Sequence, residues 1–151
     1  MSVRAQRICV AIALLAVVGT AVSSVSLHHH YKKDKTTYCD LGETFNCDIV
    51  NRSTYSVVLG VPVALIGILG YLSLLALATL YRRKAETPAM LLIASLAGLG
   101  FALYLTYIEG FVLATWCILC LSSLAMIFGI TVLSCLLVID RIRQSAATGS
   151  C

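Results

Sequence analysis

The sequence has few charged residues for its length, and this shortage excludes a soluble protein. Only 12% of its 151 residues are charged, whereas 60% are hydrophobic, and the mean hydropathy is +0.94. A soluble domain of this size needs more polar side chains to cover its surface. We also find no internal repeat, low-complexity linker or second domain. The composition therefore predicts a single integral membrane domain over residues 1–151.

Four apolar stretches are long enough to cross a bilayer as helices. A spanning helix needs about 20 mostly apolar residues, and such stretches lie at 8–27, 57–80, 89–108 and 117–139. Backbone polar groups in lipid must be satisfied within their own segment, which requires helices. We expect an all-α, four-helix membrane bundle. For the first stretch alone a cleaved signal peptide is the alternative, although its apolar run is longer than usual for one.

The basic residues predict the orientation in the membrane. With the N-terminus inside, the cytosolic segments hold the larger set, which is Arg4, Arg7, Arg82, Arg83, Lys84, Arg141 and Arg143. The outer segments hold the smaller set, which is Lys32, Lys33, Lys35 and Arg52. This bias predicts that both termini are cytosolic and that the polar loop 28–56 lies outside. The net charge of +4 is then mainly a topology signal, and we expect no nucleic-acid partner.

Seven cysteines are many for a chain of this length, and the odd number leaves at least one without an intramolecular partner. Cys39 and Cys47 lie in the outer loop, and the short connection 109–116 brings Cys117 and Cys120 to the same face of the membrane. That face is the oxidising one. The other three fall near the cytosolic face, where we expect small packed residues or reduced thiols: Cys9, Cys135 and Cys151.

Cys117 and Cys120 form a Cys-x-x-Cys motif at the start of the fourth apolar stretch. Residues three apart share a helix face, and Cys120 would lie about 4.5 Å deeper at a rise of roughly 1.5 Å per residue. Free amides and the helix dipole in the first turn favour a thiolate at Cys117. We interpret the two cysteine pairs as a relay by thiol–disulfide exchange. The loop pair would meet a soluble protein, with Cys47 reaching the helix pair, and Cys120 would meet an acceptor dissolved in lipid, such as a quinone.

Other interpretations of the outer residues stay open. The four outer cysteines could instead form two structural disulfides, or a zinc site, although a helical spacing suits zinc poorly. The three histidines at 28–30 are typical of a metal-binding tract, but their place at a membrane boundary favours an interfacial polar cap. Residues 51–53 form a glycosylation sequon close to a helix start. We expect Glu109, near the outer surface, to be solvated.

Taken together, these residues resemble the vitamin K epoxide reductase family. The matching features are Cys39-x7-Cys47, Ser53, Gly60-Val61-Pro62 at a helix start, and Cys117-Ile118-Leu119-Cys120 in the last helix. The resemblance covers about Ile8 to Ile139. It implies a four-helix bundle around a quinone that works with thioredoxin-like partners.

The resemblance also implies a role for each polar residue. Cys39 and Cys47 correspond to the shuttle pair, in which Cys39 faces the partner and Cys47 faces Cys117. Cys117 and Cys120 correspond to the active-site pair, with Cys120 toward the quinone. Ser53 corresponds to a loop serine near the reaction centre.

We expect apolar and aromatic side chains of the second to fourth helices to form the wall of the quinone pocket, and three aromatic residues are candidates. These are Tyr104, Tyr107 and Phe111. The alternative for them is simple packing or an aromatic belt at the membrane interface.

The Gly60-Val61-Pro62 start resembles the microbial branch, whose members oxidise secreted proteins. We therefore expect an oxidoreductase of the bacterial inner membrane without a fused thioredoxin domain. It would pass electrons from a separate thioredoxin-like periplasmic or luminal protein to ubiquinone, menaquinone or vitamin K, without a metal.

One alternative is a vitamin K epoxide or quinone reductase of the endoplasmic reticulum; vertebrate members carry a tyrosine at the position of Leu124. The other is a non-catalytic tetraspan adaptor whose outer loop is held by disulfides.

Overall fold

Four long helices make up most of the computed structural model, which describes residues 3–31, 47–58, 60–80 and 87–148. They are α1 (Val3–Tyr31), α3 (Val63–Leu80), α4 (Thr87–Phe111) and α5 (Ile118–Thr148). Each is long and apolar enough to cross a membrane. The predicted all-α membrane bundle of four helices is confirmed.

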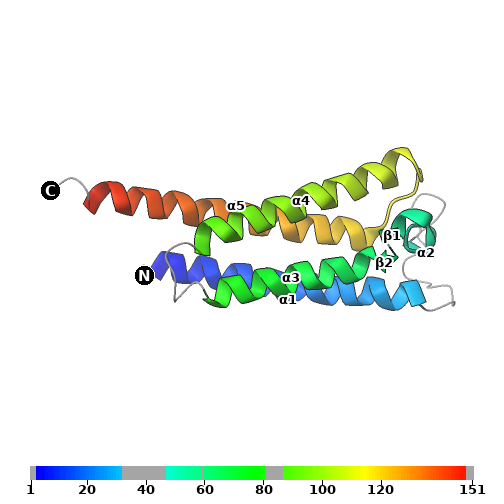
Figure 1. Ribbon diagram of the computed structural model, residues 1–151, viewed down its shortest axis with the longest axis horizontal. Helices are drawn as coiled ribbons and strands as arrows, with labels where there is room; N and C mark the ends of the chain where they lie inside the picture. The colour runs from blue at the N-terminus through cyan, green and yellow to red at the C-terminus, as the bar shows by residue number, and fades with distance from the viewer. Residues whose placement is uncertain (1–2, 32–46, 59, 81–86, 149–151) are drawn as a thin grey trace.

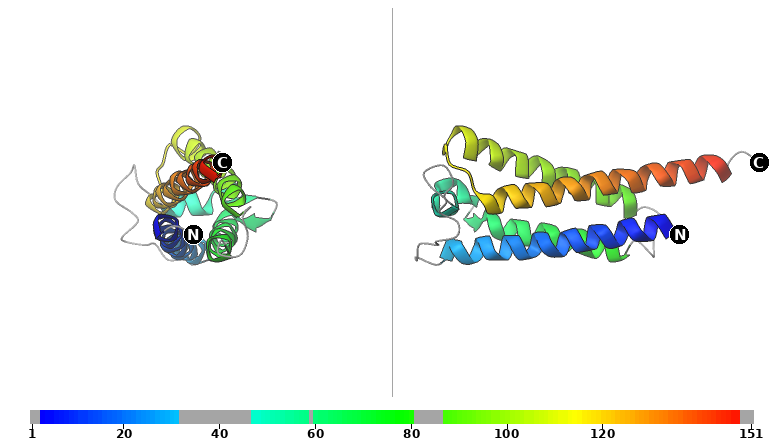
Figure 2. Two further views of the ribbon diagram at one scale, coloured as in Figure 1. Left: turned by 90° about the vertical axis from the view of Figure 1, so that its left-hand side faces the viewer. Right: turned by 180° about the vertical axis from the view of Figure 1, so that it is seen from behind.

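The four helices run side by side along the length of the molecule (Figure 1). α1 packs on α3 and α5, and α4 packs mainly on α5. Both termini lie at one end of the bundle, while the short elements gather at the other end (Figures 1 and 2). We call this second end, with the connection between α4 and α5, the loop end. The four helices thus return the chain to the end where it started.

A buried stripe on α1 explains why this helix contacts two others. Its buried members recur after alternately four and three positions, and most are small: Ala5, Cys9, Ile12, Ala16, Gly19, Ser23 and Ser26. This repeat keeps one seam of the helix facing its neighbours, and small residues let membrane helices approach closely. The packing supports the interpretation of the first stretch as a bundle helix rather than a signal peptide.

The second membrane helix begins later than predicted. The prediction placed its start at Val57, but α3 begins at Val63, after a hairpin of β1 (Val57–Val58) and β2 (Val61–Pro62). β-branched residues favour extended backbone. Gly60 has a φ of +83°, a conformation that suits glycine in a tight reversal. An apolar run does not by itself distinguish a strand from a helix, so the prediction was wrong over these residues.

The structure also adds a short helix to the predicted outer loop and lengthens three predicted helices, among them α4 (Thr87–Phe111), for which the prediction was 89–108. α2 (Cys47–Arg52) has six residues and is followed by a 3-10 turn, η1 (Thr54–Ser56). A helix this short is too brief for a hydrophobic period to identify. α1 and α5 extend beyond the predicted ranges 8–27 and 117–139, because the apolar pattern marks only the part of a helix that faces lipid.

The contact between α1 and α3 yields a stability prediction at Gly19. A Cβ added there would lie 2.6 Å from Cζ of Tyr71, whose ring is buried and whose hydroxyl donates to the Ser123 carbonyl over 2.8 Å. We expect Gly19→Ala to destabilise the purified protein by about 1–3 kcal/mol, because the ring must shift in a packed site. Thermal unfolding in detergent measures this as a lower Tm.

The matched control is Gly70→Ala on α3. A Cβ at Gly70 meets nothing within 4 Å, and alanine has the higher helix propensity, so its Tm should equal or exceed that of the wild type. An equal Tm for Gly19→Ala and Gly70→Ala would contradict the packing described here.

Candidate active site

Cys117 lies at the N-cap of α5, one residue before the first helical residue. Its carbonyl accepts the first helical hydrogen bond, from the Leu121 N–H at 3.0 Å. Cys120 is then the third residue of the helix. Both are free thiols, and their side chains are hydrogen-bonded to each other. The structure therefore brings together the two sulfurs of the Cys-x-x-Cys motif, with Cys117 at the very end of the helix.

This position favours the thiolate form of Cys117. The hydrogen bond from the Cys120 thiol lowers the pKa of Cys117, and the backbone N–H groups of Cys120 and Leu119 act in the same direction. Burial and the negative charge of Glu109 oppose them, and the net pKa is lowered. Amides at a helix start are a general means of stabilising a thiolate. Cys117 is therefore the sulfur best prepared to leave or attack as an anion.

Cys47, at the first position of α2, lies against this pair. It forms one buried cluster with Val50 and Cys117, and Cys120 packs against the edge of that cluster. Cys47 is disulfide-bonded, whereas Cys39, its expected partner, lies outside the described residues. The structure thus places Cys47 beside Cys117, as the relay interpretation expects.

The remaining cysteines lie elsewhere in the chain. Cys9 is buried in the α1 stripe, and Cys135 is a free thiol exposed on α5. Cys151 lies outside the described residues. Within the described ranges, no group of three or more His, Cys, Asp or Glu side chains is placed to hold a metal ion.

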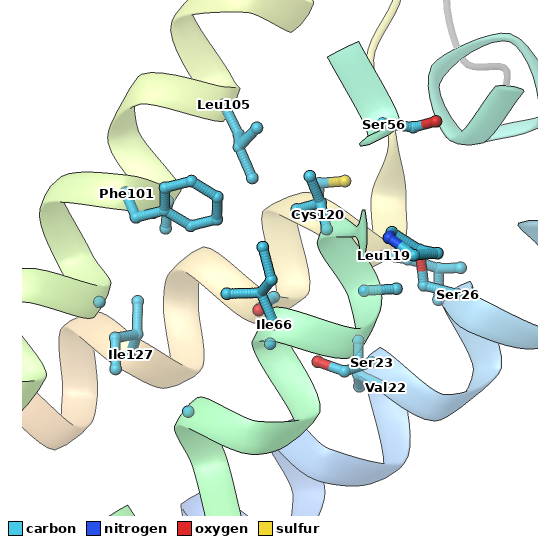
Figure 3. A pocket seen from close by; sticks show the side chains of 18 of the residues that line it. Val22, Ser23, Ser26, Ser56, Ile66, Phe101, Leu105, Leu119, Cys120 and Ile127 are labelled. Carbon is cyan, nitrogen blue, oxygen red and sulfur yellow. The ribbon is translucent and has the colours of Figure 1, made fainter. Parts of the chain in front are cut away.

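A cavity of about 390 Å³ opens next to Cys120 at the loop end. This volume falls in the range of roughly 300–1,000 Å³ that is typical of small-molecule sites. All four long helices contribute to its mainly apolar wall. Figure 3 shows Cys120 together with Phe101 and Leu105 of α4 and Ile66 of α3 among the side chains that line the cavity. A flat, apolar molecule could therefore approach the sulfur of Cys120 from the cavity.

The aromatic candidates of α4 do not line this cavity. The side chains of Tyr104, Tyr107 and Phe111 are 56%, 59% and 79% exposed, and the Tyr107 and Phe111 rings stack on each other at a centroid distance of 4.8 Å. Phe101 and Leu105, on another face of the same helix, take the wall position instead. The sequence pattern contains no sign of which face turns inward, because neighbouring helices decide that.

Ser53 does line the cavity, as the resemblance implies, but its hydroxyl has a local partner. Its Oγ donates to the Val50 carbonyl over 2.8 Å, and its carbonyl accepts from the backbone N–H of Ser56. Ser53 therefore connects α2 to η1 and lines the cavity from these short elements. Tyr71 of α3 and Ser123 of α5 also line the cavity, and their hydroxyl oxygens lie 2.9 Å apart. The sequence did not indicate this contact.

Glu109 is buried, so the prediction that it is solvated is wrong. Its side chain is only 2% exposed, and it lines the same cavity as Cys120. Its Oε2 accepts the backbone N–H of Cys117 at 3.1 Å, while its carbonyl accepts from Thr115. The chain turns back through Ala114, which has a φ of +50°, and this turn folds Cys117 over the carboxylate. Its place at the end of an apolar run made it resemble a boundary residue.

The hydrogen bond between the two thiols yields a prediction about pH. Cys120→Ala removes the donor, so the pKa of Cys117 should rise and its thiolate should form at higher pH. Cys120→Ser keeps an O–H donor and should stay closer to the wild type. The measurement is the rate of Cys117 alkylation by iodoacetamide against pH, read from peptide masses, with exposed Cys135 as internal reference. Identical pH midpoints in Cys120→Ala and wild type would contradict the assignment.

Comparison with known protein families gives one match that covers this whole arrangement. The sequence profile of the vitamin K epoxide reductase family matches residues 10–135. The match contains the three connections between the long helices, both loop cysteines, the Cys-x-x-Cys motif and Glu109. Because it spans well over half of the 151 residues, this chain belongs to the vitamin K epoxide reductase family.

Proposed function

We propose that this protein oxidises a thioredoxin-like dithiol partner and reduces a membrane quinone, and so generates disulfides for secreted proteins. Its family assigns it more generally to membrane redox enzymes that act on thiols and quinones. One observation carries the finer proposal. Cys120 lines an apolar cavity, while its neighbour Cys117 shares a buried cluster with the disulfide-bonded Cys47. A single cysteine pair thus lies between the loop and the cavity.

The first step is exchange between the partner and the loop. The family resemblance implies a disulfide between Cys39 and Cys47. A thiolate of the reduced partner attacks this disulfide. The second partner thiol then completes the partner's own disulfide, and Cys39 and Cys47 become thiols. Two electrons have moved from the partner to the loop.

The second step passes the electrons to the helix pair. The Cys47 thiolate attacks Cys117 in a Cys117–Cys120 disulfide, and Cys120 leaves. Cys39 then attacks Cys47, which restores the loop disulfide and releases Cys117. The lowered pKa of Cys117 supports this release, because a more acidic thiol leaves faster. After this step Cys47 is disulfide-bonded and Cys117 and Cys120 are thiols, which is the state found in the structure.

The third step takes place in the cavity. Cys117 and Cys120 form a disulfide, and their two electrons and two protons convert the quinone to quinol. Apolar side chains such as Ile66, Phe101 and Leu105 hold the apolar ring next to Cys120. The chain itself supplies both the electron donor and the walls of the site.

The same proposal includes a place in the cell. We place the protein in a bacterial inner membrane, with the loop end outside the cytosol and both termini inside. The excess of Lys and Arg on the segments at the terminal end supports this orientation. The alternative location, the endoplasmic reticulum, would keep the loop end in the lumen.

Quinone-coupled oxidation of a reduced thioredoxin-like protein tests the function. We expect purified wild-type protein to oxidise the dithiol only when quinone is added. Cys120→Ser should abolish quinone reduction and accumulate a mixed disulfide between Cys47 and Cys117, detected by mass spectrometry of non-reduced peptides. Comparing ubiquinone, menaquinone and vitamin K epoxide identifies the acceptor, and turnover with the epoxide alone would favour the reductase alternative.

Two controls accompany this assay. Cys135→Ser removes a free, exposed thiol outside the site and should leave the rate unchanged. A Cys120→Ser variant that still reduces quinone would show that the order of the relay is wrong. If wild-type protein oxidises no dithiol with any acceptor, the adaptor alternative is favoured instead.

The cavity itself can be tested by filling it. Ile66 lines the cavity from α3, so Ile66→Trp should obstruct the ring and raise the KM for quinone about tenfold or more, which corresponds to roughly 1.4 kcal/mol. Leu72→Trp is the matched control, because Leu72 is exposed on the same helix. Equal KM values for the two variants would place the quinone elsewhere.

A further inference from the structure

Glu109 is a buried carboxylate that the electron path does not use. It lies near the end of α4, and its side chain is 98% removed from solvent, with 2% exposed. An ionisable residue within a membrane helix is costly to bury and usually marks a functional site. Glu109 lines the same cavity as Cys120 and contacts both cysteines of the Cys-x-x-Cys motif.

The two carboxylate oxygens are in different situations. Oε2 accepts the Cys117 backbone N–H at 3.1 Å. Oε1 is buried and has no hydrogen-bond partner among the described residues. The carboxylate also interacts with the thiol of Cys120. Oε2 thus holds the start of α5, and Oε1 is a buried acceptor without a hydrogen-bond partner among the described residues.

No lysine or arginine side chain lies beside this carboxylate within the described part of the cavity wall. The titratable groups that share the cavity with Glu109 are His30 of α1, Tyr55 of η1, Tyr71 of α3 and Cys120 of α5, and Cys117 adjoins it. No lysine or arginine is among the described residues of this wall. Among these groups, the Cys120 thiol is hydrogen-bonded to the Glu109 carboxylate and can exchange a proton with it.

A purely structural role does not require a carboxylate. A single accepted N–H bond can be satisfied by a neutral amide oxygen, which is far less costly to bury than a charge. The feature that glutamine would lack is the ability to take up and release a proton. This difference separates the two roles in an experiment.

We propose that Glu109 carries the proton of the Cys120 thiol to the quinone, a role that rests on the proposed function. The net reaction breaks the S–H bonds of Cys117 and Cys120, forms one S–S bond and two O–H bonds, and moves two electrons from sulfur to the quinone ring. Glu109 accepts the proton that leaves Cys120 and donates it to one quinone oxygen. The Cys117 proton leaves to water at the loop end, and the second quinone oxygen takes a proton from the same water. Glu109 ends as the carboxylate it was at the start.

The test compares Glu109→Gln with the wild type in single-turnover reactions of reduced protein with ubiquinone or menaquinone. We expect disulfide formation between Cys117 and Cys120 to slow by about 10²–10³-fold at pH 7, the usual contribution of a positioned acid–base group. The rate of the variant should then rise with pH, because hydroxide must remove the thiol proton instead. Glu109→Asp keeps a carboxylate and should recover part of the rate.

Two controls separate proton transfer from structure. Asp140→Asn makes the same carboxylate-to-amide change at the other end of the bundle, where Asp140 lies 3.6 Å from Arg4, and should react as the wild type does. In a Cys120→Ser background, Glu109→Gln should still trap the Cys47–Cys117 mixed disulfide to the same extent. Loss of that trapping would show a structural role and overturn the proposal.

A second readout needs no quinone. Infrared difference spectra between protein reduced and oxidised by small thiol and disulfide reagents should contain a shifted carboxylate band, because the carboxylate loses the Cys120 thiol beside it on oxidation, and this band should be missing in Glu109→Gln. Absence of that band in the wild type overturns the role of Glu109 whatever the acceptor is. If wild-type protein reduces no quinone, the proposed function fails; if Glu109→Gln matches an active wild type in rate and pH profile, only the role of Glu109 fails.

Discussion

The hydrogen bond from the Cys117 N–H to Oε2 of Glu109 joins the end of α4 to the start of α5, and the active site depends on it. It closes a short connection that turns through Ala114 and leaves Cys117 at the N-cap. There the amides of the first turn and the thiol of Cys120 stabilise negative charge on its sulfur. The same contact brings an ionisable oxygen to the cavity. One hydrogen bond thus fixes the position of Cys117 at the helix start, where Cys120 and the first-turn amides lower its pKa against the opposing charge of Glu109.

The first turn of α5 separates two environments that the proposed chemistry needs. On one side, Cys117 is buried with Cys47 and Val50, where thiol–disulfide exchange can occur without competing water. On the other side, Cys120 lines an apolar cavity bounded by all four long helices. Because the two sulfurs are only three residues apart in one helix turn, electrons can cross from the loop to the cavity without movement of a domain.

Part of this arrangement could be predicted from the chain. The apolar runs indicated the four membrane helices, because only helices satisfy their own backbone in lipid, and the cysteine spacing indicated the family. The start of α3 was predicted wrongly, because the valines before Gly60 are as apolar in a hairpin as in a helix. Glu109 was taken for a solvated residue, because a charge at the end of an apolar run usually marks a boundary. The sequence offers Tyr104, Tyr107 and Phe111 as wall candidates, whereas Phe101 and Leu105 line the cavity, because the period of a helix does not say which face turns inward.

The sequence by itself determined the number of membrane helices, the family and the four cysteines of the proposed relay. These follow from local composition and spacing, which are properties of each segment alone. Only the tertiary structure decided that Cys47 lies against Cys117, that the cavity reaches Cys120 and that Glu109 is buried between them. The physical reason is that burial and hydrogen-bond partners arise from contacts between α2, α4 and α5. These contacts cannot be read from the sequence of any one of the three segments.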